Sequence, residues 1–423
     1  MVKAKTTAVI LLCIAILLAV SVLPGASPAM AQNYTIRAGD TLFSIGQKFG
    51  VQVGDLITAN NLSSDMIYPE QRLWIPPAPL RPSGSPRYVL GFYVDQENDL
   101  PCSYGSMTAN GSQISAVAPF WYRLAPDGQE AIEESRAPDG TGAGNPKAII
   151  SEAHKNNIQV LALIHNMIYA GWVDGAALAS AMLENTQTRG VFINKLENII
   201  KEYGYDGVNL DIENIRLADR DKFSLFVKEV FQRLAPQGYK VTVCVPAKTH
   251  DNLQSSWSGP FDYAQIGMYS HSVIIMTYDE HGYSSGPGPI ASSGWVRDVV
   301  KYAAQNIPPE KILLGIPGYG FDWTAGQAGP RYISYEQAVA LAQSQQANIL
   351  WDDSSQAPYF QYRDTGNRGH EVWFENAFSL GNKLDLVDEY DLKGIAIWRL
   401  GMEDPGVWDV LGCRIKTEKT SMD

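Results

Sequence analysis

The stretch DGVNLDIEN, residues 206–214, decides the expected fold. Apolar residues at positions 208, 210 and 212 alternate with Asn209, Asp211 and Glu213. A period of two sends the two sets to opposite faces of a β-strand. A polar strand face is costly to bury unless its groups hydrogen-bond to one another or bind a ligand. We therefore expect the polar face to be the functional one.

The same alternation would also fit a half-exposed edge strand with solvated carboxylates. The flanking segments favour a buried strand instead, because apolar residues recur there with helical periodicity. These residues are Ile193, Leu196 and Ile200 before the strand, and Phe223, Phe226 and Val230 after it.

Strand and helix patterns alternate from residue 87 to about residue 411. The expected strands span 88–94, 114–121, 159–165, 207–213, 240–247, 273–278, 312–319 and 394–399. Eight strands with helices between most of them predict an α/β protein with a (β/α)8 TIM barrel. A doubly wound open sheet is the alternative, but no Gly-rich dinucleotide fingerprint follows the first strand. In a barrel, the chemistry lies at the carboxyl ends of the strands, which places Glu213 at the mouth.

Residues 1–31 are typical of a secretory signal. Lys3 and Lys5 precede an apolar run, and Ala29-Met30-Ala31 supplies a small-residue cleavage pattern. We expect export with no membrane association after cleavage. An uncleaved membrane anchor stays open, because the run is long for a signal and short for a span.

The net charge excludes some classes of binding partner, and the cysteine content bears on disulfides and metal sites. Removing the signal takes the net charge from −12 to −14, which argues against nucleic acid and anionic lipid. Three cysteines remain. Cys244 lies in an apolar strand pattern and is expected to be a core thiol, which leaves Cys102 with Cys413 as a disulfide candidate. No Cys or His spacing indicates a metal site, so we expect no cofactor. We expect a monomer.

Residues 33–77 predict a small βααβ unit, too small for a large core and therefore a binding module. It resembles a LysM domain in YTIRAGDTLFSIGQKFGV, ITANN and LWIPP. The resemblance implies binding to N-acetylglucosamine-containing glycans, peptidoglycan or chitin. The glycan-binding residues it implies are Gly39, Asp40, Thr41, Leu42, Ile67 and Tyr68. The Pro-rich linker at residues 78–86 would hold this module off the main body.

DGVNLDIE matches the DGxDxDxE signature of family 18 glycoside hydrolases, with Asn209 in place of the middle aspartate. IMTYDEHG (275–282), LLGIPGYGF (313–321) and GIAIWRLG (394–401) resemble other strand ends of that family, so the resemblance spans the barrel at 87–413. A small α+β insertion is expected between strands seven and eight, at about residues 321–393.

The residues also support this chemistry directly. Asp211 and Glu213 leave one strand on the same side, so they cannot flank a sugar as two carboxylates usually do. The resemblance implies the substrate-assisted retaining route, in which the sugar's own 2-acetamido oxygen attacks the anomeric carbon. Glu213 would then be the general acid and base, and Asp211 would bind the acetamido N–H and raise the pKa of Glu213. Tyr278 would hold the acetamido oxygen.

The remaining substrate-site residues follow from the same resemblance. Asp279 would assist Tyr278, Trp398 would form the apolar floor under the sugar, and Met276 would pack beside it. Asp206 and Asn209 would orient Asp211 through hydrogen bonds.

A LysM module ahead of a barrel containing HEVWFEN resembles bacterial N-acetylglucosaminidases that act on peptidoglycan, notably the spore-cortex lytic type. The sequence therefore predicts a secreted, cell-wall-associated glycosidase, with the spore envelope as one location. A chitinase remains an alternative. A lectin-like wall protein is a second alternative, although the retained Glu213, Asp211 and Tyr278 count against it. A structural wall protein in which activity is incidental also stays open.

Overall fold

The computed structural model describes residues 32–75 and 85–420, apart from short gaps at 38–39, 50, 52, 61, 63–66, 96, 98, 127–130, 136–144, 168 and 170–171. The expected signal segment and most of the expected linker lie outside the described residues. No helix in the described ranges is both long and apolar enough to cross a bilayer.

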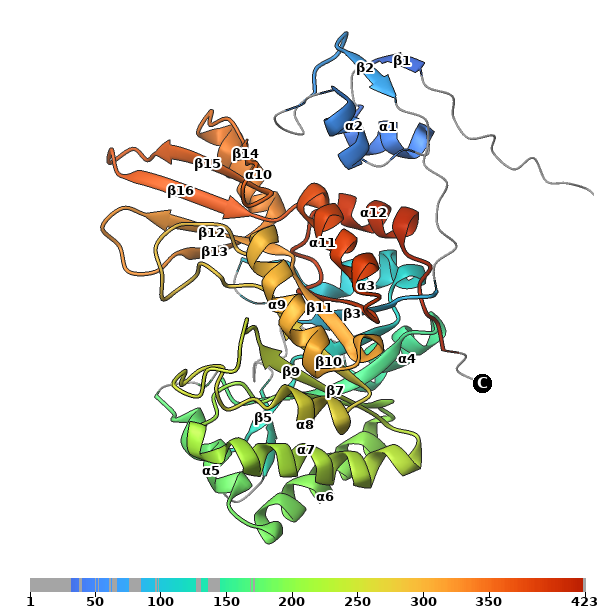
Figure 1. Cartoon of the computed structure of the whole chain (residues 1–423), viewed down its shortest axis with the longest axis vertical. Helices are drawn as coiled ribbons and strands as arrows, with labels where there is room; N and C mark the ends of the chain where they lie inside the picture. The colour runs from blue at the N-terminus through green and yellow to red at the C-terminus, as the bar shows by residue number, and fades with distance from the viewer. Residues whose placement is uncertain are drawn as a thin grey trace, which may run out of the picture.

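Eight parallel strands close into a barrel at the centre of the molecule (Figure 1). They are β3 (Tyr88–Tyr93), β4 (Ala116–Pro119), β7 (Gln159–His165), β8 (Gly207–Asp211), β9 (Lys240–Pro246), β10 (Ser272–Met276), β11 (Ile312–Pro317) and β17 (Gly394–Trp398). Each strand pairs in parallel with its neighbours, and β4 pairs with β7 to complete the ring. The predicted TIM barrel is confirmed.

The helices pack around this ring. They are α3 (Ser103–Ala109), α4 (Pro146–Lys155), α5 (Gly175–Leu183), α6 (Thr186–Tyr203), α7 (Arg220–Leu234), α8 (Tyr263–Met268), α9 (Ser293–Asn306), α11 (Ala377–Glu389) and α12 (Gly406–Arg414). The apolar face of β8 meets α6 and α7 in one buried cluster, as the helical periodicity of those segments predicts. The polar face of β8 points into the barrel, so the edge-strand alternative is wrong.

A five-stranded antiparallel sheet stands between β11 and α11, and Figure 1 shows it as a separate layer beside the barrel. Its strands are β12 (Tyr319–Thr324), β13 (Arg331–Ser334), β14 (Leu350–Asp352), β15 (Ala357–Arg363) and β16 (Gly369–Phe374), and the helix α10 (Tyr335–Ser344) lies between β13 and β14 in the sequence. The insertion is therefore shorter than the expected 321–393, because α11 packs against α9 and β11 as a helix of the barrel itself. A short hairpin after β4 was not predicted, formed by β5 (Tyr122–Leu124) and β6 (Ile132–Glu134).

The amino-terminal module has the predicted βααβ order: β1 (Gln32–Thr35), α1 (Leu42–Phe49), α2 (Val53–Asn60) and β2 (Arg72–Ile75). It does not stand away from the barrel as the linker composition suggested. Its α1 contacts α12, its α2 contacts α11, and Phe378 of α11 packs against its apolar core (Figure 1). Apolar contact at this face outweighs the extended preference of the linker.

The expected disulfide is also wrong, because Cys102 and Cys413 are both free. Cys102 instead caps α3, where its Sγ accepts a hydrogen bond from the Tyr104 backbone N–H at 3.5 Å.

Candidate active site

The two carboxyl groups predicted to act together lie at the mouth of the barrel. Asp211 is the last residue of β8, and Glu213 lies two residues beyond it rather than in the strand. Asp211 is buried, whereas Glu213 is partly open to solvent. Glu213 can thus be reached by a substrate at the mouth.

Asn166 fixes the backbone that carries Glu213. It directly follows β7 and is only 1% exposed. Its Oδ1 accepts from the backbone N–H of Glu213 at 3.0 Å and of Asn214 at 3.3 Å, while its Nδ2 donates to the Asn214 carbonyl at 2.9 Å. Sequence reasoning missed Asn166, although a polar residue immediately after a buried barrel strand is a signal for the mouth.

Burial dominates the electrostatics of both carboxyl groups. It raises the pKa of Asp211 to about 6, a rise that a hydrogen bond with Cys244 opposes. Burial also raises the pKa of Glu213 well above its usual range, and the charges of Asp211 and Asp279 add to the rise. The predicted direction for Glu213 is confirmed, but removal from water contributes more than the neighbouring charge.

Tyr278 and Asp279 follow β10. Burial raises the pKa of Tyr278, so its phenol stays protonated and can donate a hydrogen bond. The strand-seven motif makes room for this ring, because a Cβ on Gly315 would lie 2.9 Å from the Tyr278 ring and 2.5 Å from the Ile275 carbonyl oxygen. Asp279 accepts a hydrogen bond from the Tyr319 hydroxyl, which places the base of the insertion sheet against the site.

Aromatic side chains close the top of the barrel interior. Trp398, at the end of β17, makes edge contacts with Phe92 and Phe120 at ring distances of 5.2 and 5.5 Å. Met276 belongs to the same interior cluster, and Tyr278 packs against it. An apolar surface of this kind beside the carboxyl groups suits the ring face of a sugar.

Two residues expected to orient Asp211 lie differently. Asp206 is at the amino end of β8, where its Oδ2 binds His154 Nε2 at 2.9 Å and accepts from the Val160 backbone N–H at 2.6 Å. It belongs to the bottom of the barrel, because a five-residue strand separates it from the mouth. Asn209 lies inside the barrel but hydrogen-bonds to Thr242 and Cys244, not to Asp211 directly.

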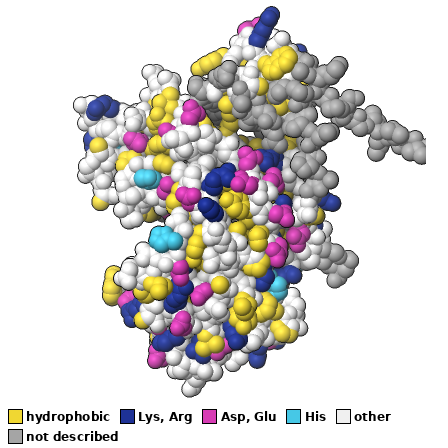
Figure 2. All heavy atoms as spheres, viewed as in Figure 1, with side chains coloured by type: hydrophobic (Ala, Val, Ile, Leu, Met, Phe, Trp, Pro, Cys, Tyr) yellow, Lys and Arg dark blue, Asp and Glu magenta, His cyan; other side chains and the backbone are white. Residues whose placement is uncertain are grey.

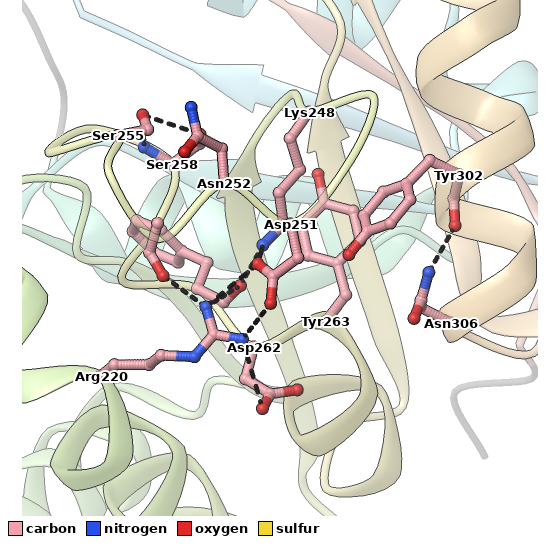
Figure 3. A network of polar contacts seen from close by, with 12 residues as sticks. Arg220, Lys248, Asp251, Asn252, Ser255, Ser258, Asp262, Tyr263, Tyr302 and Asn306 are labelled. Atoms are coloured by element: carbon pink, nitrogen blue, oxygen red, sulfur yellow. Dashed lines mark hydrogen bonds and ion pairs between the residues drawn. The ribbon is translucent and has the colours of Figure 1, made fainter.

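A network of polar contacts holds the loop between β9 and α8. Figure 3 shows the Arg220 guanidinium beside Asp251 and Asp262, at 2.8 and 3.5 Å. The buried Lys248 ammonium donates to Asp251 at 2.7 Å and to the Phe261 carbonyl at 2.5 Å. The network fixes a loop at the carboxyl end of the barrel.

Exposed aromatic rings stand on three loops at this end of the barrel. Trp172 follows β7 and is 91% exposed, Trp257 follows β9 and Tyr283 follows β10.

The surface is indented at the left of Figure 2 between the insertion sheet and the lower half of the barrel. A cavity of about 610 Å³ lies where the 285–287 loop meets the outer ends of β12, β15 and β16. Trp323 and Arg363 line it. Arg363 donates to the Asn367 carbonyl at 2.9 Å and forms no ion pair with any residue in the described ranges.

The residues implied for glycan binding in the amino-terminal module fall into two groups. Thr41 and Tyr68 are exposed. The Leu42 side chain is 2% exposed in the module's core, and Ile67 packs against that core. Asp40 stabilises the loop, accepting from the Tyr34 hydroxyl and the Arg37 backbone N–H, both at 2.7 Å. Gly39 lies outside the described residues.

In the described part of the chain, no cluster of three His, Cys, Asp or Glu side chains could hold a metal ion.

Comparisons with known proteins agree with this geometry. The model of the glycosyl hydrolases family 18 matches residues 127–403, and the LysM domain model matches residues 34–76. The cortical fragment-lytic enzyme of Bacillus subtilis is 33% identical over 274 residues, 64% of this chain and 63% of that protein. The glycosylase YdhD of the same organism is 31% identical over 89% of this chain and 97% of its own length.

Solved structures give the same result. The spore cortex-lytic enzyme SleL of Bacillus megaterium superposes with a TM-score of 0.71 at 29% identity, covering 93% of this chain and 89% of that one. A chitinase from Chromobacterium violaceum superposes with a TM-score of 0.69 at 27% identity, covering 78% of this chain and all of that one.

Proposed function

Because the chain belongs to family 18 of the glycosyl hydrolases and carries a LysM domain, we propose that it cleaves peptidoglycan after N-acetylglucosamine, with retention of configuration. The observation that carries this proposal is the pair of carboxyl groups on one side of the mouth, both with raised pKa values. Two carboxyls on the same side suit a reaction in which the substrate supplies the nucleophile.

In the first half of the proposed reaction, the 2-acetamido oxygen attacks the anomeric carbon and the bond to the leaving oxygen breaks. Glu213 gives its proton to that oxygen, which its raised pKa makes available near neutral pH. Asp211 accepts a hydrogen bond from the acetamido N–H and stabilises the positive oxazolinium ring. The Tyr278 hydroxyl donates a hydrogen bond to the acetamido oxygen.

In the second half, water attacks the anomeric carbon from the side that the leaving group vacated. Glu213, now ionised, takes the proton from this water, and the oxazolinium ring reopens to the acetamido group. The two inversions give net retention. Trp398 supports the sugar ring from below throughout.

Peptidoglycan is favoured over chitin by two observations. The relatives named above include cortex-lytic enzymes, and the cavity beside the insertion sheet contains an Arg363 guanidinium without an ion-pair partner in the described ranges. Peptidoglycan carries carboxylates on its peptide stems, whereas chitin carries none. Arginine binds carboxylates through paired hydrogen bonds.

We place the protein outside the cell on this basis, bound to wall or spore peptidoglycan through its LysM domain.

The chain's net charge of −12 gives no electrostatic attraction to nucleic acid. On the face seen in Figure 2, acidic and basic side chains are interspersed.

The test is digestion of purified vegetative and cortex peptidoglycan, with colloidal chitin in parallel, by wild type and Glu213→Gln. Mass spectrometry of the reduced products would show fragments ending in reduced N-acetylglucosamine, from wild type alone. Chitobiose from chitin, with intact peptidoglycan, would make the protein a chitinase. Binding of both polymers without cleavage of either would contradict enzymatic activity on them.

Arg363→Gln tests the substrate preference separately. It should raise KM for stem-bearing peptidoglycan fragments several-fold and leave KM for stem-free oligomers unchanged. Lys228→Gln is the matched control for loss of a surface cation, since Lys228 lies on α7, away from the cavity lining. Equal effects on both substrates, or none, would contradict carboxylate recognition.

A further inference from the structure

A chain of hydrogen bonds runs through the barrel interior beneath the candidate site. The Thr242 hydroxyl donates to the Val208 carbonyl at 3.1 Å, and Asn209 Nδ2 donates to Thr242 Oγ1 at 2.8 Å. Cys244 Sγ donates to Asn209 Oδ1 at 3.3 Å, and the register of β8 and β9 puts Cys244 beside Asp211. The chain therefore connects Asn209 to Asp211 through a thiol.

The strand register explains why the thiol occupies this place. Leu210 of β8 pairs with Val243 of β9, so the next residues along, Asp211 and Cys244, are neighbours. Both point into the barrel, because Thr242 and Cys244 alternate with outward-facing Val241, Val243 and Val245. The sequence reading of Cys244 as a core thiol is right about its burial but omits its polar contacts.

The other titratable groups around Asp211 give it no positive partner. Glu213 and Asp279 are acidic, and Tyr278 is a buried phenol. His165 of β7 pairs with Asp211 in register, and burial lowers its pKa to about 3, so it is neutral at physiological pH. Its Nε2 lies 3.2 Å from Ser135.

We propose that Cys244 is a positioning residue that holds Asp211 through a reversible hydrogen-bond chain. A thiol has one donor and one acceptor. When Asp211 is neutral, its O–H donates to Sγ and the S–H donates to Asn209 Oδ1. When Asp211 is ionised, the S–H donates to the carboxylate.

A half-turn of the Asn209 amide completes the second state. Nδ2 then donates to Sγ, and the Thr242 hydroxyl donates to Oδ1 instead of to the Val208 carbonyl. Every side chain in the network keeps a hydrogen-bond partner in both states, and no covalent bond changes. An aspartate at position 209 could not supply the amide donor, which gives the departure from the family signature a physical reason.

This inference rests on the role proposed above for Asp211, which must be ionised to stabilise the oxazolinium ring. The thiol's hydrogen bond lowers the pKa of Asp211 against the effect of burial. Without the thiol, the pKa should rise, and the acid limb of the kcat profile should move to higher pH.

The experiment compares Cys244→Ala and Cys244→Ser in the full chain, using whichever glycan the wild type cleaves. Cys244→Ser keeps one donor and one acceptor and should leave the acid limb near its wild-type position. Cys244→Ala should move the limb upward by about 0.7 pH unit, because a hydrogen bond is worth about 1 kcal/mol and one pKa unit is about 1.4 kcal/mol.

Ile274→Ala is the packing control. Ile274 is fully buried in the same interior cluster and pairs with Cys244 across β9 and β10, but its side chain has no polar atom with which to form a hydrogen bond. It should lower the melting temperature without moving the limb. Superimposable profiles for Cys244→Ala and wild type, or an equal shift in Ile274→Ala, would overturn the proposal.

A second measurement does not depend on activity. Because Asp211 has a raised pKa in the folded state, its contribution to stability falls as pH rises. Cys244→Ala should therefore lose more stability than Cys244→Ser between pH 6 and pH 8 in urea unfolding. If the wild type cleaves neither peptidoglycan nor chitin, the proposed function fails, and this measurement alone decides the role of Cys244.

Discussion

The two ends of β8 each carry acidic residues, and they are treated in opposite ways. At the amino end, Asp206 is matched by His154 and a backbone N–H, so its charge is compensated. At the carboxyl end, Asp211 and Glu213 are surrounded by apolar groups and other acids, and their pKa values rise. A buried charge that has a partner stabilises the fold. A buried carboxyl group without a positive partner has a raised pKa instead, so it keeps a proton that catalysis can use.

Among changes at the two ends of β8, we expect neutralising Glu213 to have the largest effect on kcat. Glu213→Gln should lower kcat on the glycan substrate by about 10³-fold, because it removes the proton donor. Its melting temperature should match or exceed that of wild type, since a raised pKa marks a site where the charge is unfavourable. Calorimetry beside the kinetic assay would separate the two effects, and a large fall in stability would contradict this assignment.

The variant Asp211→Asn tests the raised pKa at the carboxyl end of β8 through the pH dependence of kcat. Wild-type kcat should fall as pH drops through about 6, because Asp211 then becomes protonated and no longer stabilises the positive ring. The variant should lose about 10²-fold in kcat and show no acid limb at that pH. A limb retained in Asp211→Asn would assign it to another group.

A smaller effect is expected from Asn166, which acts on Glu213 only through the backbone. Asn166→Ala should lower kcat by about tenfold with little change in KM, because two backbone N–H groups lose their acceptor and the general acid is less well placed. Asn166→Asp retains the acceptor oxygen and should recover part of the loss at a pH where it is protonated. An unchanged kcat in Asn166→Ala would remove Asn166 from the site.

The amino end of β8 should show a change in stability alone. Asp206→Asn should cost about 1–2 kcal/mol, because the partly exposed ion pair and the bond to the Val160 N–H weaken. Its kcat should equal that of wild type. A reduced kcat in a fully folded variant would return Asp206 to the substrate site.

The pair of His154 and Asp206 at the amino end of β8 also predicts a pH dependence of the free energy of unfolding. The hydrogen bond with Asp206 raises the pKa of His154 above its usual 6.5. The pair therefore stabilises the fold fully below pH 6.5, and this contribution is lost as pH rises through the higher folded value. Urea unfolding at pH 5.5 and 8.5 should show a larger fall in stability for wild type than for Asp206→Asn, which retains only the fall that Asp211 contributes.

Much of this molecule follows from the sequence. Alternating polarity in one strand, helical periodicity on both sides and eight strand patterns predict the barrel, because the period of side chains is set by local backbone geometry. The position of Glu213 at the mouth could be predicted because a barrel brings all carboxyl ends of its strands to one face. The roles of Asp211, Tyr278 and Trp398 came from the resemblance to family 18.

Other features were decided only by tertiary structure. The end of β8 at Asp211, the contact of Asn166 with the Glu213 backbone and the thiol between Asn209 and Asp211 depend on register between strands far apart in sequence. The docking of the amino-terminal module on α11 and α12 depends on apolar surfaces that meet only after each part has folded. Local sequence determines which way a side chain points, whereas the neighbour it meets is determined by packing across the whole chain.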